Sequence, residues 1–274
     1  MENRFRSVLT FILIATAGIQ ANAQIGMNHW RIHFSAFKGQ GITKTSDNIY
    51  MACSNGIARY DLEDNTINQL TVTNGLSDLD ITAIGSNDAV VAVGYVNGNL
   101  DIIEGNEITN VPWIKSAELS GDKTVHNFCF DENYIYVATG IGLILFDNTK
   151  KEIKDTYYPY EDPVIYDIAI YRDTLFAATE EGIYFAPKNR PYLNDYTNWE
   201  KKIDLPVGVI NQKFSQIESF GDILCFGYDD IGFNDDTIYF IKDNELNKIE
   251  GELTLNSLSV SDDLLVVSLF FLMI

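Results

Sequence analysis

The chain repeats one pattern of turns and apolar segments about every forty residues, and this repeat constrains the fold more than any other feature. Each copy has a turn containing Asp or Asn, a β-branched and aromatic segment that includes an alanine, a glycine-bearing turn and a second apolar segment. The copies cover residues 46–61, 87–103, 132–147 and 172–186. We align them on Ala52, Ala92, Ala138 and Ala178, which lie 40, 46 and 40 residues apart. Regular spacing of this kind is typical of repeat architectures.

Shorter segments on either side of each copy predict two more strands per unit. A first strand is expected at 42–46, 81–85, 126–130 and 166–171, and a polar fourth strand at 66–72, 107–111 and 152–158. The apolar second strand is expected to be buried between neighbouring sheets, and the charged fourth strand to lie at an outer edge. Four-stranded units of this length are typical of β-propeller blades. A β-sandwich is disfavoured because its strands would not repeat one motif at such spacing, and no helical period is present.

Two further units continue the pattern. A looser fifth unit has strands at 214–220, 222–228, 237–243 and 245–251, and a sixth has only 255–261 and 262–268. The predicted fold class is therefore all-β, a β-propeller of four-stranded blades with about five and a half blades present. We expect the strand at 264–268 to lack an outer neighbour, with Phe270, Phe271 and Leu272 exposed or folded over the open side. The alternating segment WRIHFS at 30–35 predicts a leading strand, which in closed propellers completes the last blade.

The first 23 residues have the pattern of a signal peptide. Arg4 and Arg6 form a basic region, an apolar stretch covers 8–19, and Ala21-Asn22-Ala23 is a small-residue cleavage site. A membrane anchor is disfavoured because the apolar run is shorter than the roughly 20 residues that a spanning helix needs. We expect an exported protein whose residues 24–274 form a propeller domain, incomplete at its C-terminus, without a transmembrane segment.

The net charge narrows the classes of partner, and the positions of the cysteines bear on disulfide bonding. A formal net charge of −20 repels phosphate backbones, so nucleic-acid binding is not expected. Anionic lipid headgroups would also be repelled unless divalent cations bridged the two surfaces. Cys53, Cys129 and Cys225 each lie inside an apolar segment, which favours three separate buried thiols over a disulfide framework.

The sequence predicts no metal or cofactor site. His29 and His33 would share one face of a strand at roughly 13 Å, too far apart to bind one metal ion, and His126 opens a blade strand. An acidic stretch containing Asp229, Asp230 and Asp235 could hold Ca²⁺ through its oxygens. Its spacing does not fit the D-x-[DN]-x-[DN]-G calcium loop, so a solvated hairpin turn is favoured and calcium binding is left open.

No catalytic residue is predicted either. No nucleophile elbow, zinc-protease helix motif, phosphate-binding glycine loop or catalytic Cys/His pair occurs, so an enzyme is not expected. Carboxylates are abundant enough for a glycosidase pair, but abundance alone selects none. Tyr157, Tyr158 and Tyr160 lie in a connection between blades, where they could stack on a sugar or cover the joint between blades. The second interpretation is favoured.

The chain carries a resemblance to a known family in the segments WRIHFS, NIYMACSNGIARYD, TNGLSDLDITAIG and NGNLDIIEGNEITNV, and in residues 120–158. It resembles the N-terminal propeller of the PorZ family, whose members are components of the bacterial type IX secretion system. The resemblance runs from about residue 30 to 268. It implies a truncated seven-bladed ring and a location at the cell surface, associated with the outer membrane. It also implies a role in an attachment complex with a PorU-like sortase, which supports cargo maturation and attachment to anionic lipopolysaccharide. It supplies no catalytic residue.

Two other hypotheses remain open from the sequence. NGLSDLDI at 74–81 also resembles the periplasmic ligand-sensing propellers of two-component regulators. A carbohydrate-active enzyme would be a third class, since some propellers carry acidic central channels, but no residue pattern supports it here.

Overall fold

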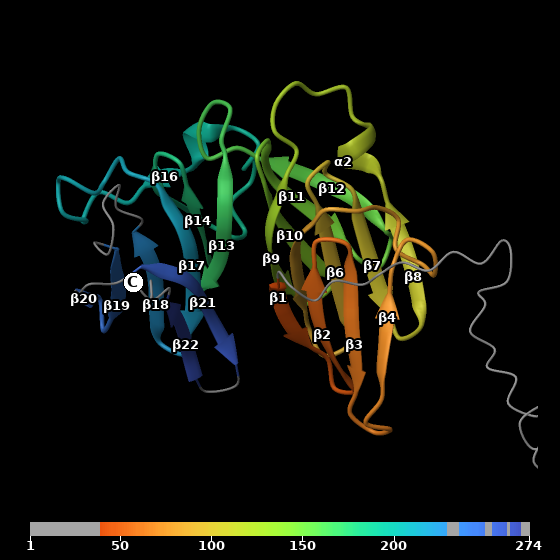
Figure 1. Ribbon diagram of the computed structural model, residues 1–274. Coiled ribbons are helices and arrows are strands. Elements are labelled where there is room, and N and C mark those ends of the chain that lie inside the picture. Colours follow the sequence, from red (N-terminus) through yellow and green to blue (C-terminus); the bar gives the residue numbers. More distant parts are fainter. Residues whose placement is uncertain (1–38, 229–235, 250–253, 262–263, 270–274) are drawn as a thin grey trace, which may run out of the picture. The chain divides into compact units, whose positions relative to one another are not determined.

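The structure is a computed structural model of the 274-residue chain. It describes residues 39–228, 236–249, 254–261 and 264–269, all within the compact unit that spans 34–274 (Figure 1). Several sequence predictions lie outside these residues. They concern the signal peptide, the leading strand at 30–35, the possible calcium ligands Asp229, Asp230 and Asp235, and the apolar residues 270–272.

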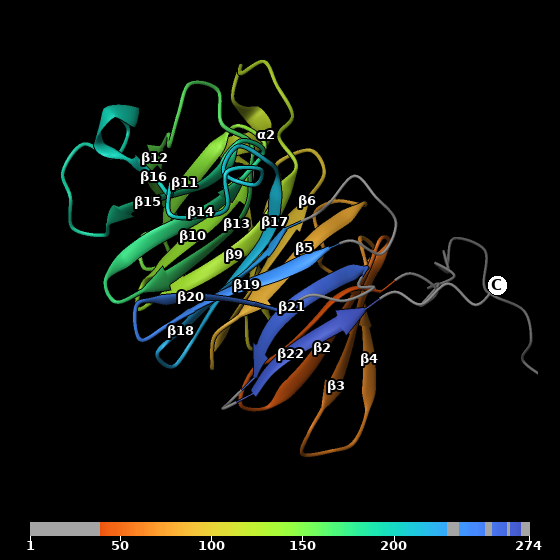
Figure 2. The ribbon, with the colours of Figure 1, turned by 90° about the vertical axis from the view of Figure 1, so that its left-hand side faces the viewer.

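The described strands form five four-stranded antiparallel sheets and one two-stranded sheet, and in every sheet the strands keep their sequence order. We number these sheets as blades 1 to 6 (Figures 1 and 2). Blade 1 contains β1 (Gly39–Lys44), β2 (Asn48–Cys53), β3 (Gly56–Asp61) and β4 (Ile67–Leu70), and blade 2 contains β5 (Ile81–Ser86), β6 (Val90–Tyr95), β7 (Leu100–Glu104) and β8 (Glu107–Val111). Blade 3 contains β9 (Val125–Asp131), β10 (Tyr134–Thr139), β11 (Gly142–Asp147) and β12 (Glu152–Tyr157), and blade 4 contains β13 (Ile165–Tyr171), β14 (Thr174–Thr179), β15 (Gly182–Pro187) and β16 (Glu200–Lys201). Blade 5 contains β17 (Phe214–Phe220), β18 (Ile223–Tyr228), β19 (Thr237–Lys242) and β20 (Glu245–Ile249), and the described part of blade 6 contains β21 (Leu255–Ser261) and β22 (Leu264–Leu269).

The hydrophobic core lies in the joints between consecutive blades, and one apolar cluster fills each of the five joints. Strand β6 shows how the sequence builds two joints at once, because its successive side chains point to opposite faces. Val91 and Val93 pack toward blade 1, whereas Val90 and Ala92 pack toward blade 3. Every residue of β6 is buried, while most of β4 and β20 is exposed. The propeller prediction, with buried second strands and polar outer strands, is confirmed.

A small residue is required at one position of each second strand, and the register corrects our alignment of it. Ala52, Ala138 and Ala178 each lie opposite the third residue of the neighbouring first strand. In blade 2 that place belongs to Gly94 rather than to Ala92, which pairs with Gly85. A Cβ atom on Gly94 would lie 2.3 Å from Cγ1 of Val125 in blade 3, so the next blade packs against this position. Because every second residue of a strand lies on the same face, the sequence alone does not distinguish Ala92 from Gly94 as the small position.

Each first strand has an irregularity near its start. The pairing skips one residue in β1, β5, β9, β13, β17 and β21. A β-bulge of this kind re-aims the side chains around it. The residue after each bulge is the one opposite the small position described above, and four of these residues are polar, namely Asn127, Asp167, Gln216 and Ser257.

Two short helices and one late strand were not predicted. Helix α2 (Trp113–Ser116) follows β8, and a 3₁₀ helix, η1 (Tyr196–Asn198), lies between β15 and β16. The sequence shows no sign of a fourth strand in blade 4. That strand, β16, is only two residues long, and it follows an excursion of twelve residues, 188–199. The buried Trp199 anchors this excursion by donating its indole N–H to the carbonyl oxygen of Leu193 at 2.9 Å.

Candidate interaction surface

The sequence motif Asn74-Gly75-Leu76-Ser77-Asp78 forms the connection from blade 1 to blade 2. The Asn74 side chain closes the turn, since its Oδ1 accepts from the Thr71 N–H and its amide donates to the Gln69 carbonyl, both at 2.6 Å. Gly75 has a φ of +143°, which favours glycine. Leu76 is buried in the joint between the two blades. The first half of the motif therefore closes a turn and fills a joint.

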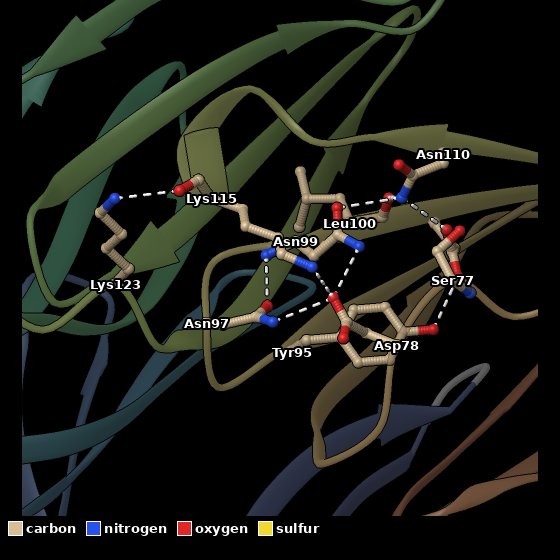
Figure 3. A network of polar contacts seen from close by, with 10 residues as sticks. Ser77, Asp78, Tyr95, Asn97, Asn99, Leu100, Asn110, Lys115 and Lys123 are labelled. Atoms are coloured by element: carbon tan, nitrogen blue, oxygen red, sulfur yellow. Dashed lines mark hydrogen bonds and ion pairs between the residues drawn. The ribbon is translucent and has the colours of Figure 1, made fainter. Parts of the chain in front are cut away.

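The second half of the motif begins a network of polar contacts (Figure 3). Oδ2 of Asp78 accepts from the side-chain amides of Asn97 at 2.9 Å and Asn99 at 3.0 Å, and from Nζ of Lys115 at 2.6 Å. Burial works to raise the pKa of Asp78, but the hydrogen bonds from Lys115, Asn97 and Asn99 outweigh it and hold the pKa below its ordinary value. The carboxylate thereby ties the loop, the β6–β7 hairpin and helix α2 together.

Asp101 is the buried centre of the same region. It is fully buried, and its Oδ2 accepts from the Ser77 N–H at 2.8 Å and from the Tyr95 hydroxyl at 2.6 Å. Oδ1 accepts from the Asn110 amide at 3.0 Å. Burial raises the pKa of Tyr95, and the Asp101 charge adds to this effect. Three donors thus satisfy this carboxylate, as a buried charge requires.

A second polar chain connects the first strands of blades 3, 4 and 5. Oδ1 of Asp167 accepts from the Asn127 amide at 2.7 Å, and Oδ2 accepts from the backbone N–H of Ile217 at 2.8 Å. Asp167 also accepts from the N–H of Ile168 in its own strand. One joint further on, Oε1 of Gln216 accepts from the backbone N–H of Leu258 in blade 6. Side chains that follow the bulges therefore link consecutive blades.

Asp167 and Glu218 form a pair of carboxyl groups with raised pKa values. Burial raises the pKa of Asp167 to about 7, against the opposing effect of its hydrogen bonds. Burial also raises the pKa of Glu218 to about 8, and the Asp167 charge adds to it. Raised carboxyl pKa values are common at catalytic sites. Here Asp167 is buried and satisfied by three donors, and it lines neither of the two grooves described below, so the arrangement is that of a structural link.

His126 and the three tyrosines considered in the sequence, Tyr157, Tyr158 and Tyr160, lie in or beside the connection between blades 3 and 4. His126 lies on the bulge of β9, and its ring packs on Tyr166 of blade 4 with centroids 5.1 Å apart. Tyr157 packs into the core between blades 3 and 4, and the Tyr160 ring packs on Tyr184 at 5.1 Å. Tyr158 lies over Gly142, where a Cβ atom would be 3.1 Å from its ring. The contacts of Tyr157 and Tyr160 favour the interpretation that these tyrosines cover the joint.

Two shallow grooves are lined by described residues. The first, of about 450 Å³, lies between blades 1 and 2, and Arg59, Asp61 and Asn106 are among its lining residues. The second, of about 470 Å³, is lined by parts of β1, by the β5–β6 turn and by Ser259 and Val260 of β21. Within the described ranges, no group of three or more His, Cys, Asp or Glu could hold a metal ion. No helix in the same residues is long and apolar enough to cross a membrane.

Sequence reasoning missed Asp101 and Asp167, although a signal was present. Each is a single acidic residue inside an otherwise apolar strand segment, LDII and YDIAIY. A lone carboxylate at such a place must be satisfied by several donors, because an unpaired buried charge is unstable. The pattern could therefore have indicated an internal polar link, but the donors come from other blades and could not be named.

Sheets that follow one another in sequence order, joined by apolar clusters and polar links between blades, define a β-propeller. A family model, that of the N-terminal β-propeller domain of PorZ from the type IX secretion system, matches residues 49–200, which is more than half of the chain. The chain belongs to this family.

Solved structures agree on the fold. PorZ of Porphyromonas gingivalis, described as an essential bacterial surface component of the type IX secretion system, is 17% identical with a TM-score of 0.62 over 86% of this chain and 38% of that one. The WD40 β-propeller domain of Doa1 is 12% identical with a TM-score of 0.59, over 82% of this chain and 74% of that one. BamB from Moraxella catarrhalis is 12% identical with a TM-score of 0.53, over 80% and 66%. The chain thus spans 38% of the PorZ chain it matches. A search of curated proteins finds no match.

Proposed function

We propose that this protein is an exported, non-catalytic binding and scaffold module of the type IX secretion attachment complex at the bacterial cell surface. In this role it contacts a PorU-like sortase and supports cargo maturation and the attachment of cargo to anionic lipopolysaccharide. The signal-peptide pattern of residues 1–23 accounts for its export. The observation that carries the proposal is the family match over residues 49–200.

The polar chemistry of the described residues supports a binding role over a catalytic one. Asp101 and Asp167, which are both buried inside blades, are satisfied by internal donors. A catalytic acid or base must instead reach a proton on the substrate. The motif that also resembles ligand-sensing propellers is likewise taken up by internal bonds, because Asp78 and the Ser77 N–H brace the loop. It therefore gives the sensor hypothesis no separate support.

The proposal is tested in a bacterium that carries this gene and a type IX secretion system. We expect deletion of the gene to leave cargo with uncleaved sorting domains and without lipopolysaccharide, as measured by mass spectrometry and immunoblotting. Complementation with the wild-type gene should restore both. Cargo that is cleaved and modified in the deletion strain as in the parent would contradict the proposal. In a second measurement, the purified protein and the sortase should elute together in size-exclusion chromatography.

A further inference from the structure

Four large apolar side chains are exposed on the loops at one end of blade 2. They are Leu79 in the connection from blade 1, Val96 in the β6–β7 hairpin, Trp113 in helix α2 and Leu119 in the loop that follows it. Their exposed fractions are 51%, 46%, 56% and 53%. Exposed apolar residues that occur singly need no explanation, but a group carried by adjoining loops indicates an interaction site.

Hydrogen bonds hold these loops against one another. The Val96 N–H donates to the Asp80 carbonyl at 3.1 Å, which joins the hairpin to the segment that carries Leu79. Asp78 binds the hairpin through Asn97 and helix α2 through Lys115 (Figure 3).

The loop that carries Leu119 is held in the same way. Nζ of Lys123 donates to the carbonyl oxygens of Lys115 at 3.1 Å and Ala117 at 2.6 Å, and so fastens the loop to the end of α2. Packing adds to this, because a Cβ atom on Gly98 of the hairpin would lie 2.8 Å from Ile114 and 3.0 Å from Lys123. Hydrogen bonds and packing thus fix the loops that carry the four side chains. This fixed arrangement lowers the conformational entropy lost when a partner binds.

The charge around these side chains is negative. Asp80, Glu118 and Asp122 are exposed. The two ammonium groups of this region are both engaged, Lys115 with Asp78 and Lys123 with backbone carbonyls. The segments 78–80, 96–99 and 113–123 therefore contain four carboxylates, counting Asp78, and only two lysines. A partner that fits would bring apolar side chains together with Lys or Arg.

We infer that Leu79, Val96, Trp113 and Leu119 form a docking surface for a basic segment of another protein, with Trp113, the largest of the four, as the main anchor. The inference rests on the proposed binding role, but it does not depend on which secretion component is bound. An anionic lipid surface would meet the exposed carboxylates, and a second copy of this acidic face would place carboxylate against carboxylate. A basic protein segment is the occupant that these charges favour. Tryptophan is among the residues most often found at the energetic centre of protein interfaces.

The test uses the purified protein and three labelled synthetic peptides, with binding followed by fluorescence anisotropy. The first peptide alternates Lys with Leu and Trp, the second has Glu in place of Lys, and the third has Ser in place of Leu and Trp. We expect only the first to bind well, with an affinity that falls as salt is added. Trp113→Ser and Leu79→Ser should each weaken its binding by about tenfold. Tyr196→Ser and Ile203→Ser, at exposed apolar positions of blade 4, are the matched controls and should keep wild-type affinity.

All four substitutions keep the net charge. A loss of affinity confined to the blade 2 variants would therefore be due to the apolar surface rather than to general attraction to an acidic protein. Equal affinity in all variants, or equal loss in the controls, would overturn the inference. So would binding to vesicles of anionic lipid, or self-association seen in ultracentrifugation, if either were abolished by Trp113→Ser. The deletion strain described above tests the secretion role separately, so a failure here leaves that result interpretable.

Discussion

The carboxylate of Asp167 on β13 accepts the backbone N–H of Ile217 on β17 at 2.8 Å, across the joint between blades 4 and 5. The same side chain accepts from Asn127 on β9, so one residue links three consecutive first strands. First strands of different blades do not pair with one another in the described sheets. The side chain of Asp167 therefore provides a directional connection where apolar packing alone would allow sliding.

Replacing Asp167 by alanine should strongly destabilise the protein. The half-buried Asn127 amide and the buried Ile217 N–H would both lose their acceptor, and we expect a loss of about 3 kcal/mol in the free energy of unfolding. Urea denaturation of the purified variant measures this loss. Glu245→Ala, on the exposed edge strand β20, is the control and should change stability by less than about 0.5 kcal/mol. Equal stabilities of the two variants would contradict the assigned role.

The pair formed by Asp167 and Glu218 should make stability depend on pH. Burial raises the pKa of Glu218 to about 8, and the Asp167 charge adds to it. The unfolded chain ionises a glutamate at about pH 4, so stability falls as the pH rises from there toward 8. Glu218→Gln removes the group, and we expect it to stabilise the protein by about 1 to 3 kcal/mol at about pH 8, with a smaller gain at about pH 5. Denaturation at both pH values, with Glu245→Gln as control, tests this. A pH-independent difference would show that Glu218 is not held in its protonated form.

Much of the fold could be predicted because each blade repeats the same physical requirements. A second strand that packs against two neighbours must be apolar on both faces, and an outer strand must be polar, and both properties are visible in the sequence. The exact small position in blade 2 was not visible. Ala92 and Gly94 are two residues apart on the same face, and only the register with β5 shows that Gly94 takes the place of Ala52.

The polar links could not be predicted to the same degree. The motif at 74–78 was recognised, but the partners of Asp78 and Ser77 lie in a hairpin, a helix and strand β7, and their meeting depends on how the loops pack. Helix α2 contains four residues, too few to show a helical period in the sequence. Contacts between elements that are distant in sequence follow from packing and not from local pattern.

Glycine at position 182 should be needed for two independent reasons. Its φ is +123°, and a Cβ atom would lie 2.3 Å from the carbonyl oxygen of Ile210, a backbone atom that cannot move aside easily. We therefore expect Gly182→Ala to cost about 2 to 4 kcal/mol of stability. Gly208→Ala is the matched control, since a Cβ atom there meets nothing within 4 Å. Thermal melts of both variants measure the difference, and a well-folded Gly182→Ala protein with an unchanged midpoint would refute it.

The two carboxylates of the blade 2 network should differ in their importance for stability. Asp101 is fully buried, and its loss leaves the Tyr95 hydroxyl and the Ser77 N–H without an acceptor, so Asp101→Ala should cost about 3 kcal/mol. The Asp78 side chain is 22% exposed and its partner Lys115 is 43% exposed. Water can replace much of that contact, so Asp78→Ala should cost about 1 kcal/mol. The reverse order in urea denaturation would mean that the exposed brace, not the buried one, holds the loop.

The three cysteines should be unreactive in the folded protein. All are free thiols; Cys53 and Cys225 are buried, and Cys129 is half-buried in the joint between blades 3 and 4. Burial raises the pKa of Cys129 to about 12, with the Asp167 and Glu218 charges adding to it, and raises that of Cys225 to about 11. Because the thiolate is the reactive form, very little of it is present at about pH 8.

We therefore expect a disulfide-exchange reagent to modify the native protein only as fast as it unfolds, and to modify three thiols at once in urea. Asp167→Ala should speed the modification in native buffer, because it raises the population of the open form. Glu245→Ala serves as the control and should leave the rate unchanged. Rapid modification of a single cysteine in the native wild-type protein would show that one joint between blades opens without global unfolding. If that residue were Cys129, in the joint between blades 3 and 4, the outcome would contradict the view that the links at Asp167 keep these blades together.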